Sequence, residues 1–132
     1  MMNVGNPPIF ATDYDRAACR IGIVHVGYGA FHRAHQAVYI DDYMQHTGDL
    51  SWGIAAVNLR TSESAAFAVA QQGDDGYLLK YTGKTTPTAY RLVRPHVQFA
   101  DWSRQTAEAE GLIALESVHA VTITVTESGY YL

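Results

Sequence analysis

Two glycines, Gly27 and Gly29, stand between an apolar run and a helical pattern, where a glycine pair can do specific chemistry. A glycine at the end of a strand allows a tight turn, and a second one lets the backbone approach a pyrophosphate closely. The helix that follows presents free N–H groups and the positive end of its dipole to the phosphates. The pattern predicts the phosphate-binding loop of a dinucleotide site; the alternative is a plain turn from strand to helix.

Position 32 holds a histidine, where a third glycine usually permits close packing of the helix on the strand. Ala30 and Ala34 are small and could provide that close approach instead. Arg33 follows directly, and its guanidinium could donate charge-assisted hydrogen bonds to phosphates. The structural alternatives are a capping or hydrogen-bonding role for His32 and a solvated Arg33.

Histidines near the loop raise the alternative of a metal site. His32 and His35 share a helix face, and His25 lies on the preceding strand. Zinc needs three or four converging ligands, and the sequence adds only Cys19, with no HExxH-type pattern. We therefore expect no metal, and a zinc-binding fold built on the three histidines is the weaker alternative.

The end of the second apolar run, "VNLRTSE", should distinguish NAD from NADP. An acidic residue there binds the ribose hydroxyls, whereas a basic residue favours the 2′-phosphate. No carboxylate follows immediately: Asn58 can bind hydroxyls, Arg60 could meet a phosphate, and Glu63 lies further along. We expect NAD as the cofactor and keep NADP open.

A last polar group stands in "TITVTESGYYL", near the end of the sequence. Thr124, Thr126 and Glu127 stand at the carboxyl end of a predicted strand, and open parallel sheets bind ligands at that edge. Glu127 could lie near the reacting end of a cofactor. The alternative for Glu127 is an ordinary solvated glutamate.

The elements that must position these residues follow from periodicity and turn signals. Ile21–Val26 and Trp52–Leu59 are short apolar runs typical of buried parallel strands. The spacing predicts a helix over 31–45 that ends near Gly48. A second helix is expected from Thr61, capped by Thr61 or Ser62 and ended before Gly73.

The second half of the chain alternates less regularly. Residues 76–99 are rich in Tyr, Thr and Val around a "TGKTTP" turn, which predicts a β-hairpin followed by an extended segment. We expect a helix capped by Asp101 and then a strand over 118–126. The order predicts an α/β, Rossmann-like three-layer domain with a mainly parallel sheet and a β-hairpin insertion. Residues 1–19 are expected to be a lead-in, and residues 20–132 the dinucleotide-binding domain.

Composition limits the classes of partner. A net charge of −4 gives no electrostatic reason to expect nucleic acid or an anionic membrane. The single cysteine, Cys19, cannot form an intramolecular disulfide, which fits the reducing cytoplasm. We see no signal peptide and no apolar run near the roughly 20 residues that span a bilayer. We therefore expect a cytoplasmic, globular domain.

Three stretches together, "GYGAFHRAHQAVYIDD", "WGIAAVNLR" and "VTITVTESGYYL", resemble the mannitol dehydrogenase family of polyol-specific long-chain dehydrogenases. This family includes arabinitol dehydrogenases and the fructuronate and tagaturonate reductases. The resemblance runs from about Ile21 to Leu132. In this family histidine normally occupies the third position, and the enzymes need no metal.

The resemblance implies hydride transfer between a nicotinamide cofactor and a polyol or ketose. It places the following residues at the cofactor: Gly27, Tyr28, Gly29, Ala30, Phe31, His32 and Arg33 at the pyrophosphate, Asn58 and Arg60 at the adenosine ribose, and Thr126 and Glu127 near the nicotinamide. A helical C-terminal domain would supply the substrate pocket and the catalytic lysine, and the sequence stops before it. Lys80 and Lys84 lie in the predicted hairpin, so we expect no catalytic residue here and no activity of this chain alone.

Two alternatives stay open beside a mannitol or arabinitol type of substrate. One is the cofactor domain of a fructuronate- or tagaturonate-type reductase. The other is a nucleotide-binding fragment without catalysis. The substrate itself cannot be inferred, because the resemblance places its pocket outside this sequence.

Overall fold

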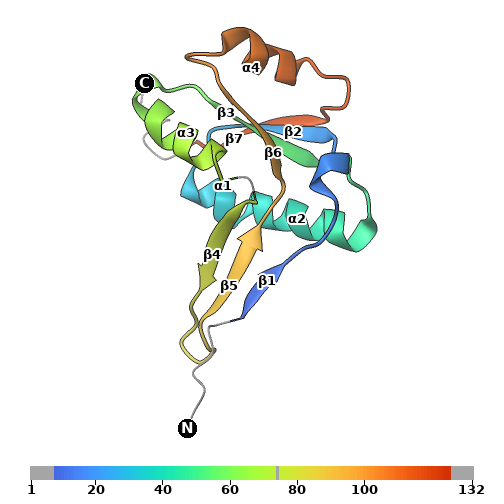
Figure 1. Cartoon of the computed structure of the whole chain (residues 1–132), viewed down its shortest axis with the longest axis vertical. Coiled ribbons are helices and arrows are strands. Elements are labelled where there is room, and N and C mark those ends of the chain that lie inside the picture. Colours follow the sequence, from blue (N-terminus) through green and yellow to red (C-terminus); the bar gives the residue numbers. More distant parts are fainter. Residues whose placement is uncertain (1–7, 74, 126–132) are drawn as a thin grey trace.

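The main sheet consists of four strands. The computed structural model describes residues 8–73 and 75–125 and orders these strands as β6 (His96–Asp101), β3 (Gly53–Asn58), β2 (Ile21–Val26) and β7 (Ala120–Ile123). All three pairings are parallel (Figure 1). The chain starts in the middle of the sheet, adds strands to one side and then crosses to the other, which is the Rossmann order. The predicted α/β class with a mainly parallel sheet is confirmed.

The helix predicted over 31–45 is two helices, α1 (Ala30–Ala34) and α2 (Gln36–Thr47), separated at His35. His35 leaves the helical region, with φ −123° and ψ −86°. Its Nδ1 donates a 2.8 Å hydrogen bond to the carbonyl of Phe31, which satisfies an acceptor at the end of α1. Gly48 ends α2 with φ 70°, as predicted.

The expected N-caps of the two later helices are wrong, because a turn precedes each helix. A 3₁₀ turn at Thr61–Glu63 leads into α3 (Ser64–Gln71), whose N-cap residue is Glu63. Helix α4 (Thr106–Ile113) has Gln105 as its N-cap residue. The Asp101 carboxylate accepts from the backbone N–H and the hydroxyl of Ser103, and so shapes the turn before the helix.

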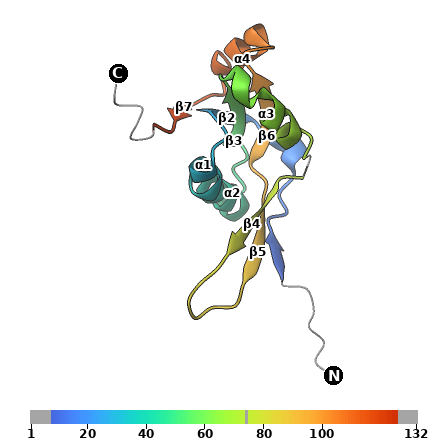
Figure 2. The same ribbon diagram turned by 90° about the vertical axis from the view of Figure 1, so that its left-hand side faces the viewer.

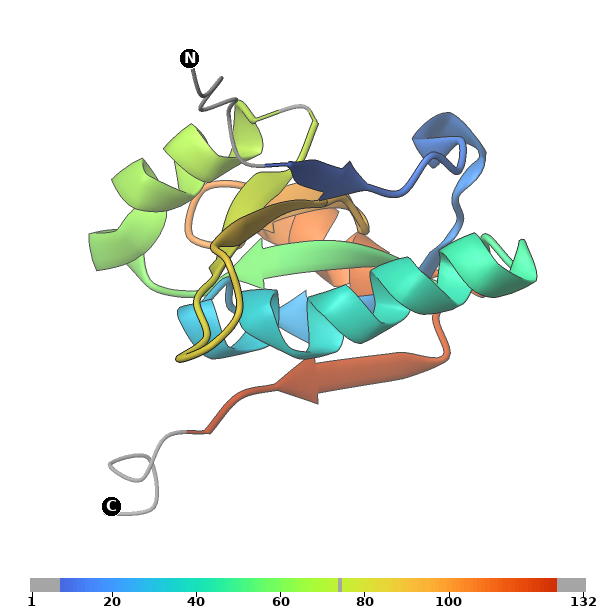
Figure 3. The ribbon, with the colours of Figure 1, turned by 90° about the horizontal axis from the view of Figure 1, so that it is seen from below.

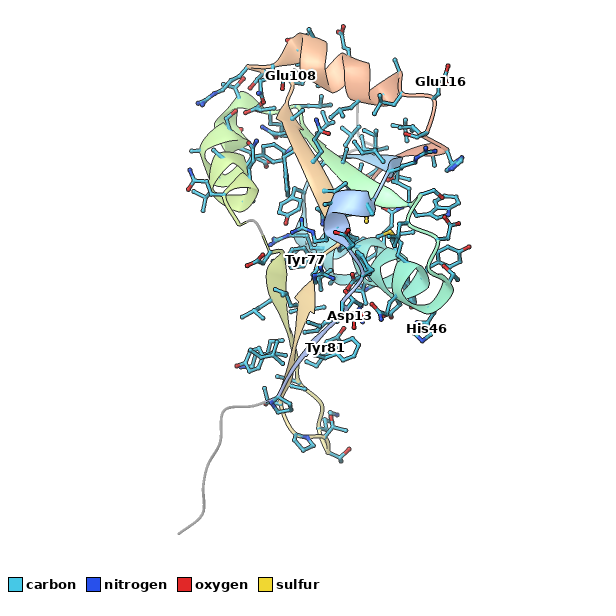
Figure 4. The ribbon with its side chains drawn as sticks, turned by 45° about the vertical axis from the view of Figure 1, so that its right-hand side comes forward. Asp13, His46, Tyr77, Tyr81, Glu108 and Glu116 are labelled. Atoms are coloured by element: carbon cyan, nitrogen blue, oxygen red, sulfur yellow. The ribbon has the colours of Figure 1, made fainter. Side chains whose placement is uncertain are left out.

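The predicted hairpin is present as β4 (Tyr77–Tyr81) and β5 (Ala89–Val93), which pair antiparallel. It forms a second sheet with β1 (Ile9–Ala11), which pairs parallel to β5. This sheet extends away from the main one (Figures 1 and 2). Tyr77 lies near the main sheet, and Tyr81 lies further out along the hairpin (Figure 4).

Part of the expected lead-in belongs to the folded body. Besides β1, it contains a 3₁₀ turn at Arg16–Ala18. The fully buried Asp41 on α2 accepts hydrogen bonds from the hydroxyls of Thr12 and Tyr14. Asp13 also exchanges hydrogen bonds with Gln45, and Figure 4 shows it beside α2. The sequence did not reveal this segment because its partners lie far along the chain.

Helices cover both faces of the main sheet (Figure 2). On one face α4 buries Ala109 and Leu112 against the sheet, in a core of Ile21, Val24, Ala55, Val57 and Ala100. On the other face α2 and the second sheet enclose a core of Ile23, Ala37, Ile54 and Val93. The predicted three-layer arrangement is therefore present.

Because the main strands are parallel, their carboxyl ends meet at one edge. In Figure 3 the arrowheads of β3 and β7 point to the same side, where the chain turns from β2 into α1 and from β3 into α3. This edge gathers the polar residues considered next. Among the described residues, no helix has the length and apolar character needed to cross a bilayer.

Candidate functional site

A hollow of about 400 Å³, here called the edge hollow, opens at the carboxyl edge of the main sheet. Its lining comes from the glycine loop, the turn after β3 and the end of β7: His25, Val26, Gly27, Tyr28, Gly29, Ala30, Phe31, Asn58, Leu59, Arg60, Glu63, Ile123 and Thr124. The structure therefore brings the predicted residues of the glycine loop together with Asn58 and Arg60. The edge hollow lies where open parallel sheets bind ligands.

The two glycines of the loop do different things. Gly27 has φ +117°, which L side chains rarely adopt, so the turn itself requires glycine. Gly29 has an ordinary φ of −77°, and a Cβ there would meet nothing within 4 Å. Glycine at 29 therefore leaves open space beside the backbone, as a closely approaching ligand requires.

A second hollow of about 450 Å³, here called the α3 groove, adjoins the first and shares Tyr28, Gly29, Asn58 and Glu63 with it. Arg33 lines this groove, with its guanidinium carbon 5.2 Å from the ring centre of Tyr28 and 5.7 Å from that of Tyr77. The Tyr77 hydroxyl donates to the Arg33 carbonyl. Arg33 thus lies beside the predicted pyrophosphate loop, facing the groove.

His32 is buried behind the loop and is absent from the lining of both hollows. Its ring stacks on that of His25, with centroids 3.6 Å apart and planes 5° from parallel. Its Nε2 lies 2.8 Å from Nε2 of His96 on β6. A flat ring stacked on the strand thus provides the close packing that a third glycine would otherwise permit.

Burial keeps this histidine cluster, His25, His32 and His96, in the neutral form. It lowers the pKa of His25, lowers that of His32 to about 4, and lowers that of His96 well below its usual value. His35 lies outside the cluster, exposed and stacked on Phe31. The ligand set of the zinc alternative is thus not assembled, and no group of three or more metal-ligating side chains gathers in the described part of the chain.

Asn58 is buried at the end of β3, and its side chain holds the following turn. Its Nδ2 donates to the carbonyl of Arg60 and to the carboxylate of Asp101, and its Oδ1 accepts from the N–H of Arg60. Asn58 therefore positions Arg60 at the rim of the edge hollow. Arg60 is exposed there and lies 3.7 Å from a carboxylate oxygen of Glu63.

Thr126 and Glu127 lie outside the described residues, so their predicted place is not tested. Val26, Leu59 and Ile123 also line the edge hollow and were not predicted, whereas Thr124 was expected at this edge of the sheet. Val26 and Leu59 end the predicted strands, and this position was the signal that could have found them. Ile123 lies inside the strand predicted over 118–126, which ends at Ile123 in the structure.

Known proteins resemble both the sequence and the fold. No family model matches the chain. It is 38% identical over 120 residues to the mannitol 2-dehydrogenase of Pyricularia oryzae, covering 89% of this chain and 23% of that protein. With that of Cereibacter sphaeroides it shares 33% identity over 89% of its own length and 24% of the other's.

Among solved structures, the Pseudomonas fluorescens mannitol 2-dehydrogenase in ternary complex with NAD and D-mannitol superimposes with a TM-score of 0.86 at 31% identity, over 95% of this chain and 25% of that one. This chain belongs to the mannitol dehydrogenase family. A substrate-free D-sorbitol dehydrogenase also superimposes, with a TM-score of 0.83 at 25% identity, over 94% of this chain and 26% of that one. The chain thus spans about a quarter of the length of these relatives.

Proposed function

We propose that this chain is the cofactor-binding part of an oxidoreductase that transfers a hydride between NAD and a polyol or its ketose, of the mannitol or arabinitol type. The observation that carries the proposal is the edge hollow, with open space at Gly29 and the positive-φ turn at Gly27 on one wall. The names of the relatives supply the substrate class, and the NAD of the Pseudomonas complex supplies the cofactor.

In this proposal each part of the site has a role. The backbone from Gly27 to Phe31 faces the pyrophosphate, while Asn58 and Arg60 lie near the adenosine ribose. Arg33 faces the phosphates from the α3 groove, and His32 supports the loop by its packing. Thr126 and Glu127 lie near the nicotinamide.

NAD is preferred over NADP in this proposal because the cation at the end of β3 already has an anionic neighbour. Glu63 lies beside Arg60, so its carboxylate would repel a 2′-phosphate placed there. The purified chain should therefore bind NADH in a calorimetric titration, and NADPH more weakly. No saturable binding of either nucleotide to a folded chain would contradict the proposal.

The chain by itself should not oxidise a polyol. Proton transfer from the substrate hydroxyl needs a base within hydrogen-bond reach. Its lysines, Lys80 and Lys84, belong to the hairpin, which extends away from the main sheet (Figure 2). Steady-state assays with mannitol or arabinitol and NAD should show no turnover, and measurable turnover would contradict this expectation.

A further inference from the structure

A run of hydrogen bonds joins the histidine cluster to the end of β7. The Thr122 hydroxyl lies 2.7 Å from Nδ1 of His25 and donates to the side-chain amide oxygen Oε1 of Gln36 at 3.2 Å. The same Oε1 lies 2.9 Å from Nδ1 of His32, and Nε2 of His32 lies within hydrogen-bond distance of Nε2 of His96. The run thus links β2, α1, α2, β6 and β7 behind the glycine loop.

The side-chain amide oxygen Oε1 of Gln36 sets the direction of every bond in the run, because it can only accept. His32 must donate from Nδ1, so the neutral ring accepts at Nε2 from the Nε2–H of His96. The Thr122 hydroxyl donates its only proton to Gln36, so its oxygen accepts from the Nδ1–H of His25. Nδ1 of His96 is buried and has no hydrogen-bond partner among the described residues. In this tautomer it carries no proton, so no N–H donor is buried there without an acceptor.

The same reasoning leaves Nε2 of His25 as a bare acceptor at the edge hollow. His25 lines this hollow, and its Nε2 would lie 3.7 Å from a Cβ built on Gly27. The His25 residue as a whole is 2% exposed, so it contributes only a small part of its surface to the hollow. Within residues 8–73 and 75–125 this nitrogen is an acceptor without a hydrogen-bond partner, and it lies close to Gly27 of the glycine loop.

We propose that Nε2 of His25 accepts a hydrogen bond from a ribose hydroxyl of the bound dinucleotide, and that Thr122, Gln36 and His32 are positioning residues that fix this tautomer. The inference rests on the proposed binding of NAD. A bare imidazole nitrogen repels phosphate oxygens, which are also acceptors, and selects donors. His25 lies on β2 and bonds to Thr122 on β7. The strand order reverses between these two strands, and a dinucleotide crosses the sheet edge there, with one ribose on either side of the crossing.

Imidazole nitrogen chemical shifts test the inference directly on the purified, ¹⁵N-labelled chain. The Nδ1–H tautomer is expected for His25 and His32, and the Nε2–H tautomer for His96. Adding NADH or ADP-ribose should shift Nε2 of His25, since both ligands carry both riboses. A shift with NADH alone would assign the donor to the carboxamide and overturn the proposal, as would an Nε2–H tautomer of His25.

Two variants at Thr122 separate positioning from packing. Thr122→Val keeps the shape and removes the hydroxyl, whereas Thr122→Ser keeps the hydroxyl. Thr122→Val should weaken NADH binding about tenfold, which is the effect of one lost hydrogen bond. It should also let His25 populate the Nε2–H tautomer beside the Nδ1–H tautomer. Thr122→Ser should retain both properties. Equal NADH affinities of the two variants would overturn the inference. So would tight binding of NADH by the parent chain without a change in the nitrogen shifts of His25. If the parent chain bound no NADH at all, the proposed function would be overturned instead.

Discussion

The polar residues around Asp41 and those around the edge hollow use their hydrogen-bonding capacity in opposite ways. Asp41 is fully buried and accepts hydrogen bonds from Thr12, Tyr14 and Arg91, so its carboxylate is satisfied by groups inside the protein. At the edge hollow the loop leaves space at Gly29 and a bare nitrogen on His25. Polar groups satisfied internally stabilise the fold, whereas those left open can bind a ligand.

The largest effect should come from the Asp41 side of this comparison. Asp41→Asn removes the charge opposite Arg91 inside the protein and should lower the free energy of unfolding by about 3 kcal/mol. Asp42→Asn is the matched control, because its side chain is 41% exposed and also pairs with Arg91, so about 1 kcal/mol or less is expected. Urea denaturation measures both. Equal losses would show that burial of Asp41 does not decide its contribution.

Acid should reduce stability through the histidine cluster. The unfolded chain binds a proton at His32 near pH 6.5, whereas the folded chain does so only near pH 4. Protonation therefore stabilises the unfolded chain relative to the folded one as the pH falls below 6.5. His32 alone should lower the free energy of unfolding by about 2 kcal/mol between pH 7.5 and 5. His32→Gln should reduce this dependence. A stability of the parent chain that stays constant over this range would contradict the neutral cluster.

The loop glycines should separate stability from binding. Gly27→Ala forces a side chain into φ +117° and should cost about 1–3 kcal/mol of stability. Gly29→Ala meets no atom within 4 Å, so stability should hold, while NADH affinity should fall about tenfold as the added methyl occupies ligand space. Calorimetry and thermal unfolding of both variants check this. Unchanged affinity in Gly29→Ala would mean that no ligand approaches the backbone there.

The smallest effect should come from the exposed pair at the rim. Glu63→Gln removes the carboxylate beside Arg60 and should raise the affinity for NADPH about threefold relative to NADH. Its effect on stability should stay below about 1 kcal/mol, as for other surface pairs. Parallel titrations with both nucleotides measure the ratio. A rise in NADH affinity instead would place the 2′-position away from this pair.

Local patterns predicted the elements whose cause is local. The apolar runs of β2 and β3, the stop at Gly48 and the hairpin follow from residues close in sequence. The break at His35 escaped prediction because it depends on a side chain bonding back to the carbonyl of Phe31. The loop sequence likewise located the edge hollow.

Contacts between distant residues could not be inferred from such patterns. Asp41 meets Tyr14 and Arg91 only after the chain has folded, so the strand at Ile9–Ala11 was not expected. His96 was not singled out because its partner His32 lies on another element. For the same reason a histidine in the third loop position suggested a ligand contact, whereas the structure gives it an internal one.

The most direct test of the account is to follow the backbone amide signals of the purified chain while NADH is added. The account predicts the largest shifts at residues 27–31 and 58–60, which line the edge hollow, with little change around Asp41. Shifts centred on the hairpin or on α4, or none at saturating NADH, would contradict a dinucleotide site at the carboxyl edge of the main sheet.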